Sequence, residues 1–308
     1  MTCEHRGVHS IDHYALYVPS LPQAQHFFAS FGLEVEASGQ HLTLRAADGR
    51  VWARILPGEQ KSLAYLSFNC YAQDYDALRQ QVEHQGARFE TGDGVGFWFR
   101  DPHGNLLQIK VGDKTMPNGK VTHASISDTA PVRGVGTRDQ LPRIQPTRLS
   151  HVLFFSPDVP ASIDFYQRAI GLRLSDKSQD IIAFLHAPHG CDHHLVAFAK
   201  SSAKGWHHAA WEVASIDEVG VGAAQMAKAG YGKGWGTGRH ALGSNYFHYV
   251  QDPWGSFCEY SAEMDFIAKG TVWPTGDFNP ENSLYLWGPD VPENFIFNTE
   301  ASAAPPIP

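Results

Sequence analysis

The sequence predicts an α+β fold made of two similar halves, in each of which strands alternate with short amphipathic helices. The main observation is an internal repeat, in which three separate stretches of the first half have counterparts in the second. A second observation is composition. The chain has 308 residues, of which 43% are hydrophobic and 18% charged, as expected for a globular protein of about two domains.

The first repeated stretch opens each half. SIDHYALYVPSLPQAQHFFASFGLEV (residues 10–35) is similar to RLSHVLFFSPDVPASIDFYQRAIGLRL (residues 148–174). Each copy predicts a strand, a turn that contains proline, a short amphipathic helix, and a glycine that ends the helix before another strand.

The second and third stretches complete each half. Residues 61–89 are similar to residues 204–232, and both predict a strand followed by an amphipathic helix that ends at a glycine. Residues 99–111 (FRDPHGNLLQIKV) are similar to residues 250–262 (VQDPWGSFCEYSA), and both predict two strands joined by an Asp-Pro-X-Gly turn. Each half therefore contains the order strand, helix, strands twice.

Domain boundaries follow from the ends of the repeat. We expect an N-terminal domain over residues 1–114 and a C-terminal domain over residues 148–266. Residues 115–147 are rich in Pro, Gly, Ser and Thr and predict a linker. Residues 267–308 have no helix or strand period but carry several aromatic residues, so this tail should pack along the C-terminal domain.

Composition also excludes several classes of function. The net charge is −8 and no basic block is present, which argues against nucleic acid or anionic membrane as a partner. No segment approaches the roughly 18 apolar residues of a membrane span. The first residues contain no apolar signal core, so we expect a cytoplasmic protein. The scattered cysteines predict reduced thiols, since none forms a CxxC pair: Cys3, Cys70, Cys191 and Cys258.

Aligning the two halves shows which of them has residues that can bind a metal at equivalent positions. His151 corresponds to His13, His208 corresponds to Tyr65, and Glu259 corresponds to Gln108. The C-terminal half thus has His, His and Glu where the N-terminal half has His, Tyr and Gln.

Two imidazoles and one carboxylate on one face of an ion form the facial triad typical of non-heme Fe(II) oxygenases. A tyrosine and a neutral amide bind such an ion much more weakly. The sequence therefore predicts one metal site, held by His151, His208 and Glu259, and an N-terminal domain without catalytic activity. A metal would also compensate the cost of burying Glu259 among apolar neighbours.

The chain resembles the type I extradiol ring-cleaving dioxygenases of the vicinal oxygen chelate superfamily. The resemblance spans roughly residues 10–266. It is most specific in LSHVLFF, DHHLVAFAK, GWHHAAWEV, GRHALGSNYFHY and DPWGSFCEYSAEMDF. It implies two glyoxalase- or bleomycin-resistance-like domains, each of two βαβββ modules that form an open barrel around a site.

The resemblance also implies the activity. His151, His208 and Glu259 would hold Fe(II), with Mn(II) as the other candidate, while further side chains surround the substrates: His194, His240 and Tyr249. The substrates would be a catechol and O2, and the product a muconic semialdehyde-type compound of aromatic degradation. Members of this family generally form homo-oligomers, so we expect one here.

The neighbouring residues give weaker indications. Trp206, Phe247 and Trp235 are candidates for an apolar substrate pocket, and Arg239 is the arginine closest to the predicted site in sequence. In the family that the chain resembles, members with carboxylate-bearing substrates tend to have extra arginines before the position of His240. Since no second arginine accompanies Arg239, the resemblance implies a neutral or hydrophobic catechol.

Strand alternation makes a further prediction about the paired histidines. His193 and His207 should face away from the site, because successive side chains of a strand point to opposite faces. We expect structural roles for His186, His189 and His248 as well.

Two alternatives stay open. One is a glyoxalase- or epimerase-like metalloenzyme of the same fold, and the other is a ligand-sequestering protein without catalytic activity. The first would consume a glutathione hemithioacetal, and the second would bind its ligand without a metal.

Overall fold

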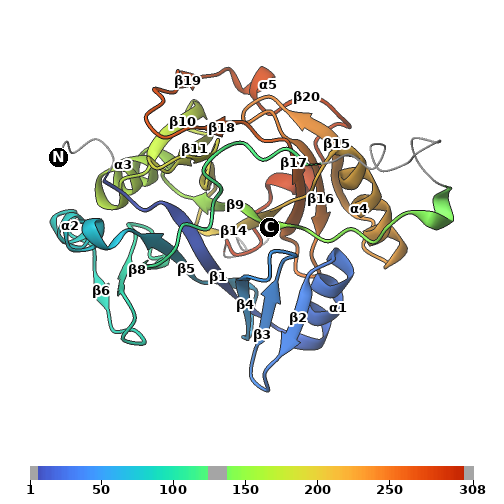
Figure 1. Ribbon diagram of the computed structural model, residues 1–308, viewed down its shortest axis with the longest axis horizontal. Helices are drawn as coiled ribbons and strands as arrows, with labels where there is room; N and C mark the ends of the chain where they lie inside the picture. Colours follow the sequence, from blue (N-terminus) through green and yellow to red (C-terminus); the bar gives the residue numbers. More distant parts are fainter. Residues whose placement is uncertain (1–5, 124–136, 302–308) are drawn as a thin grey trace, which may run out of the picture.

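Two mixed β-sheets lie side by side in the computed structural model, which describes residues 6–123 and 137–301 (Figure 1). The predicted α+β fold with four βαβββ modules is confirmed. The N-terminal modules comprise β1 (Ser10–Val18), α1 (Leu21–Phe31), β2 (Glu34–Ala37), β3 (Leu42–Arg45) and β4 (Val51–Pro57), then β5 (Ser62–Cys70), α2 (Ala72–His84), β6 (Phe89–Glu90), β7 (Phe97–Arg100) and β8 (Leu106–Val111).

The C-terminal modules repeat this order. They comprise β9 (Arg148–Ser156), α3 (Val159–Ile170), β10 (Arg173–Ser178), β11 (Ile182–His186), the short β12 (Cys191–Asp192) and β13 (Val196–Lys200), then β14 (Gly205–Glu212), α4 (Ile216–Lys228), β15 (Gly234–His240), β16 (Tyr246–Gln251) and β17 (Phe257–Ala262). In each sheet the first strands of the two modules pair antiparallel at the centre, β1 with β5 and β9 with β14.

Local sequence signals place the helix and strand ends as predicted. The Asp158 side chain accepts a hydrogen bond from the backbone N–H of Ala161 and begins α3, and Gly171 ends the helix with a φ of 75°. In the Asp-Pro-X-Gly turn before β17, the carboxylate of Asp252 accepts the backbone N–H groups of Trp254 and Ser256. These turns fix where the site-bearing strands start.

The two halves pack through their helices and through aromatic side chains. Helix α1 contacts α4, and α2 contacts α3. The rings of Phe31 and Tyr260 stack with centroids 3.9 Å apart, and the Tyr260 hydroxyl donates to the Phe31 carbonyl oxygen. Trp206 packs against Tyr14 across the same boundary. The core is therefore continuous between the halves.

The C-terminal tail lies along the C-terminal sheet and adds strands to both of its edges, where Figure 1 shows it in orange and red. It contains β18 (Phe266–Ile267), β19 (Gly276–Asp277), α5 (Pro280–Ser283), β20 (Tyr285–Trp287) and a 3₁₀ helix (Glu293–Ile296). We expected no strands here. Strands of two or three residues are too short to produce a period in the sequence.

The tail is fixed to the N-terminal half at Glu300. The Lys61 ammonium, whose side chain is 2% exposed, lies 2.8 Å from a carboxylate oxygen of Glu300. It also donates to the Trp206 carbonyl oxygen and to the Ser256 hydroxyl. The same Glu300 oxygen accepts a hydrogen bond from the backbone N–H of Trp206. One buried cation therefore joins the N-terminal half, β14 and the tail.

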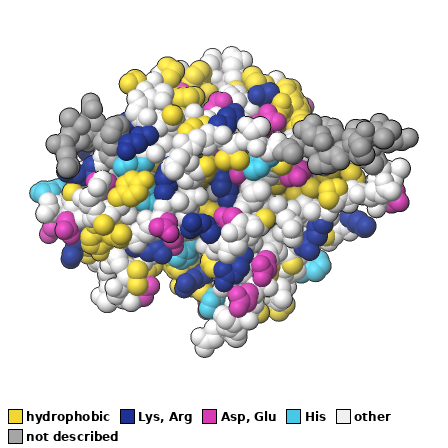
Figure 2. Space-filling view, in the orientation of Figure 1, with side chains coloured by type: hydrophobic (Ala, Val, Ile, Leu, Met, Phe, Trp, Pro, Cys, Tyr) yellow, Lys and Arg dark blue, Asp and Glu magenta, His cyan; other side chains and the backbone are white. Residues whose placement is uncertain are grey.

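The surface carries both signs of charge. On the face that Figure 2 shows, Lys and Arg side chains are interspersed with Asp and Glu side chains. Within the described ranges, no helix is both long and apolar enough to cross a bilayer.

A buried histidine outside the site gives a pH prediction. Burial, and after it the charges of Arg173 and His193, lower the pKa of His186 to about 4, against about 6.5 in an unfolded chain. Below pH 6.5 the unfolded state therefore binds more protons, so the free energy of unfolding should fall as the pH drops from 6.5 to 4 and be insensitive to this group above that range.

The expected contribution of His186 is at most about 3 kcal/mol at pH 4. Urea denaturation at several pH values would measure it, with a His186→Gln variant as the comparison. The variant should lose less stability between pH 7 and pH 4.5 than the parent protein, and an equal loss would contradict the prediction.

Candidate metal centre

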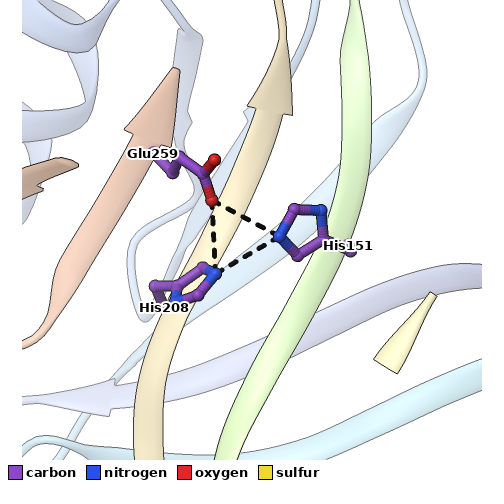
Figure 3. Close-up of side chains that lie close together, drawn as sticks. All are labelled: His151, His208 and Glu259. Carbon is purple, nitrogen blue, oxygen red and sulfur yellow. Dashed lines mark hydrogen bonds and ion pairs between the residues drawn. The ribbon is translucent and has the colours of Figure 1, made fainter. Parts of the chain in front are cut away.

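Three neighbouring strands bring the predicted triad together. His151 on β9 and Glu259 on β17 both lie opposite Ala210 of β14, and His208 lies two residues earlier on β14. Their donor atoms converge, as Figure 3 shows: the two Nε2 atoms are 3.3 Å apart, and each is 3.3 Å from Oε2 of Glu259. Among the described residues, this is the cluster of His, Cys, Asp and Glu with ligand atoms close enough to share an ion.

The Glu259 carboxylate is completely buried and half satisfied. Its Oε1 accepts a hydrogen bond from the Asn245 amide, whereas Oε2 has no hydrogen-bond donor among the described residues. A buried anionic oxygen without a donor is costly, and a bound cation would compensate it.

The outer hydrogen bond of His208 directs its Nε2 toward the triad. Nε2 of His207 donates to the Phe295 carbonyl oxygen, so Nδ1 of His207 is the acceptor in the neutral ring. Nδ1 of His208 lies 2.6 Å from it and must donate. The lone pair of His208 is therefore on Nε2, and burial, the main cause, lowers the pKa of His208 to about 4 and keeps the ring neutral.

His151 is oriented in the same way from the other side. The Ser150 hydroxyl donates to Asp192, so its oxygen accepts from Nδ1 of His151 at 3.2 Å. Nε2 of this ring is then also a lone-pair donor. Ligands about 2.1 Å from a metal and at right angles lie about 3 Å apart, close to the separations found here. The residues thus fit a divalent cation.

The prediction that His207 faces away from the site is wrong. Both His207 and His208 line the same cavity. The reason is a β-bulge: Trp206 pairs with Phe154 and His208 with the adjacent Leu153, which leaves His207 as an extra residue on β14. An extra residue interrupts the alternation of faces on which the prediction depended.

A cavity of about 320 Å³ opens beside the triad, and the three other predicted site residues line it. His194 packs against His151 with ring centroids 4.1 Å apart. Burial, and after it the neighbouring histidines, lower the pKa of His194 well below its ordinary value. The ring is therefore neutral and able to accept a proton from a bound molecule.

His240 and Tyr249 form a pair on the opposite wall. Nδ1 of His240 donates to the Leu284 carbonyl oxygen, and Nε2 of His240 accepts from the Tyr249 hydroxyl at 2.9 Å. Burial, and after it Glu259, raise the pKa of Tyr249 well above its ordinary value, so this hydroxyl keeps its proton as a donor. It can be redirected toward a ligand oxygen.

The structure places the remaining candidates outside the cavity lining. Trp206 lies in the core between the halves. The Arg239 guanidinium stacks on Tyr246 at 4.6 Å and donates to its hydroxyl and to the Ser244 carbonyl oxygen. Phe247 stacks on His240 and supports that ring from behind. These side chains, and Trp235 with them, would not touch a molecule in the cavity.

Sequence reasoning missed several residues that do line the cavity. Five come from the tail: Pro280, Ser283, Leu284, Phe295 and Ile296. Asn245 also lines the cavity. Its place in GRHALGSNYF matches no motif that would have predicted a role in the site. Tail contacts of this kind have no sequence signature. The other histidines assigned structural roles lie outside the lining, as expected: His186, His189, His193 and His248.

The corresponding place in the N-terminal half is occupied by internal hydrogen bonds. Nε2 of His13 lies 2.9 Å from the Tyr65 hydroxyl, and Nδ1 lies 2.6 Å from Asp12. Gln108 accepts from the Ser67 hydroxyl and donates to the Val95 carbonyl oxygen. These groups satisfy one another, so no buried anion there requires a cation.

Comparison with known proteins agrees with the fold and with the site. Residues 148–260 match the Glyoxalase/Bleomycin resistance protein/Dioxygenase superfamily. The chain is 58% identical over 299 residues to "Metapyrocatechase 2" of Cupriavidus necator, covering 96% of this chain and 93% of that protein.

Two solved structures show the same architecture. A Mn(II)-bound glyoxalase from Novosphingobium aromaticivorans superposes with a TM-score of 0.76 at 24% identity, covering 94% of both chains. A homoprotocatechuate 2,3-dioxygenase from Brevibacterium fuscum gives a TM-score of 0.74 at 18% identity, covering 96% of this chain and 83% of that one. At these identities the likeness concerns the fold alone.

Proposed function

This chain belongs to the extradiol ring-cleaving dioxygenases of the glyoxalase/bleomycin resistance protein/dioxygenase superfamily, and from that premise we propose that it opens catechol-type rings with dioxygen. The observation that carries the proposal is the buried triad of His151, His208 and Glu259 beside the cavity, in which a carboxylate oxygen lacks a hydrogen-bond donor among the described residues. The reaction adds both atoms of O2 to the catechol and breaks the ring bond next to the diol. It gives a muconic semialdehyde-type product and needs no external reductant.

The triad would hold Fe(II), or Mn(II), since these ligands suit either ion. When bound, such an ion supplies Lewis acidity toward the diol and a means of transferring electrons between the ring and oxygen. His194 is placed to accept a hydroxyl proton from the diol and to return it later in the reaction. Tyr249, held by His240, is placed to donate a hydrogen bond to a substrate oxygen that gains negative charge.

The cavity favours an uncharged substrate. Beyond the histidines its walls are mainly apolar, with Leu153, Phe155, Ile182 and Phe184 on strands β9 and β11 and the tail residues opposite. Among the described residues that line the cavity, Lys200, which is exposed, is the one with a formal charge. A carboxylate on the substrate would lose its hydration here without a buried cation to pair with.

We therefore expect kcat/KM for catechol and its methyl-substituted forms to exceed that for a catechol with a carboxylate side chain by at least about 10-fold, chiefly through KM. Initial-rate assays with a series of alkyl-substituted catechols and a series of carboxylate-bearing catechols would measure kcat and KM for each. Lys200→Ala is the control, since it removes the one lining cation and should change the ratio little. Equal efficiency toward the two series would contradict an apolar specificity.

The test of the activity is anaerobic reconstitution with Fe(II) or Mn(II), followed by addition of catechol and oxygen. We expect oxygen uptake with a 1:1 consumption of catechol and a yellow product, and loss of both after chelation. Consumption of a glutathione hemithioacetal without oxygen uptake would favour the glyoxalase-like alternative. Catechol binding that is unchanged by the chelator, together with no turnover, would favour a ligand-sequestering protein.

The same proposal includes a homo-oligomer in the cytoplasm. Several apolar side chains of the tail are exposed and could be covered by a second copy: Leu286, Trp287, Ile296 and Phe297. Cys70, Cys191 and Cys258 are free thiols, which is consistent with a reducing compartment. Light scattering on the purified protein would test the oligomer.

A further inference from the structure

We propose that Asp176 and His193 are positioning residues that fix the ring orientation and the proton location of His194. The inference rests on the proposed function, in which His194 accepts the substrate proton. Neither Asp176 nor His193 lines the cavity. His193 contacts His194 through a hydrogen bond, and Asp176 contacts His193.

The three side chains form a continuous hydrogen-bonded chain. Nδ1 of His194 lies 3.1 Å from Nδ1 of His193, and Nε2 of His193 lies 2.8 Å from Oδ2 of Asp176. His193 is fully buried and Asp176 is 5% exposed. Buried polar groups without an alternative partner in water are held firmly by such bonds.

The direction of each bond follows from the carboxylate. Asp176 can only accept, so Nε2 of His193 carries the hydrogen. In the neutral ring, Nδ1 of His193 is then the acceptor, and Nδ1 of His194 must donate to it. His194 is left with its lone pair on Nε2, at the opposite edge of the ring. That is the tautomer that an acceptor of the substrate proton requires.

Asp176 is itself held in place by the tail. Its Oδ1 accepts the backbone N–H of Gly276 at 2.8 Å, and its Oδ2 also accepts from the Trp273 indole at 3.2 Å. Because Oδ1 is bound to a backbone donor, which cannot rotate away as a side chain can, an asparagine at this position would keep its oxygen there. Its amide nitrogen would then face His193, and the Trp273 indole would lose its acceptor.

Asp176→Asn therefore reverses the hydrogen-bond directions between Asp176, His193 and His194, with the loss of the Trp273 hydrogen bond at Oδ2. The amide nitrogen would donate to Nε2 of His193, which would move the His193 hydrogen to Nδ1 and the His194 hydrogen to Nε2. We expect kcat to fall by about 100-fold or more, as is found when a catalytic histidine is held in the wrong tautomer. KM for catechol and the iron content should change less than about threefold, because the triad and the cavity wall are untouched.

Asp277→Asn is the matched control. Asp277 is the neighbouring carboxylate on β19, pairs with Lys177 at the surface, and makes no contact with His193. Its variant should keep the kcat of the parent protein. A parent-like kcat in Asp176→Asn, measured at pH 8 on protein that carries its full iron content, would overturn the inference and leave the proposed dioxygenase activity intact.

A spectroscopic measurement tests the same chain independently of turnover. In zinc-loaded protein with ¹⁵N-labelled histidine, the imidazole nitrogen shifts should show His194 protonated on Nδ1 and His193 on Nε2. In Asp176→Asn, the proton of His194 should instead be on Nε2 and that of His193 on Nδ1. His194 protonated on Nε2 in the parent protein would refute the inference even if the variant failed to fold, whereas failure of the proposed function would appear as no oxygen uptake by the parent protein.

Discussion

A Glu259→Gln variant is expected to lose its divalent metal and, with it, all measurable ring cleavage. The amide is neutral and a weaker ligand, so the two imidazoles are left to hold the ion alone. The substitution also gives position 259 the residue type that the N-terminal half has at the equivalent register position, Gln108. We expect metal affinity to fall by more than about 100-fold, since the loss of an outer-shell partner alone costs 10- to 100-fold. Metal analysis after gel filtration and oxygen uptake with catechol would measure the two effects.

The control for this variant is Gln108→Ala. Gln108 bonds Ser67 and the Val95 carbonyl oxygen. Its loss should lower the stability of the N-terminal half by about 1–3 kcal/mol while leaving kcat per bound iron within about twofold. If instead Glu259→Gln kept its metal, or if Gln108→Ala lost its metal, the assignment of the site to the C-terminal half would be wrong.

A His194→Phe variant is expected to keep its metal and to turn over about 10²- to 10⁴-fold more slowly, which is the usual contribution of a positioned acid or base. Phenylalanine fills the same space against His151 and Phe184 but has no nitrogen to accept the substrate proton. Steady-state kcat and iron content, measured on the same preparation, separate the two effects.

His248→Phe makes the same chemical change on β16 at a histidine outside the cavity lining. Its kcat should equal that of the parent protein. Should His194→Phe retain the full kcat with its full iron content, His194 would have no part in proton transfer, and another cavity residue, with His207 the nearest candidate, would have to take that role.

The internal repeat was sufficient to predict the fold and the triad, because both depend on register. Aligning the halves equates His13 with His151 and Gln108 with Glu259. In the structure His13 and Gln108 both lie opposite Ser67. His151 and Glu259 both lie opposite Ala210, the equivalent position in the other sheet. A pairing register is set by patterns of apolar side chains along several strands, so it survives in the sequence even where the ligands have changed.

Features that depend on one extra residue or on the tail could not be predicted. His207 enters the cavity because of a bulge on β14, and a bulge has no reliable signal in a single sequence. The Leu284 and Phe295 carbonyl oxygens that orient His240 and His207 are backbone atoms, so no residue type marks them. Arg239 was proposed from its closeness in sequence to His240, whereas strand alternation turns its side chain toward Tyr246.

The buried ion pair between Lys61 and Glu300 has a consequence for any attempt to shorten the protein. Removing the N-terminal half would remove the cation that holds Glu300 beside Trp206, and would leave Glu300 without its ion-pair partner. The N-terminal half thus supplies an anchor for the tail of the other half, and a shortened protein made from residues 148–301 alone would need a new ion-pair partner for Glu300.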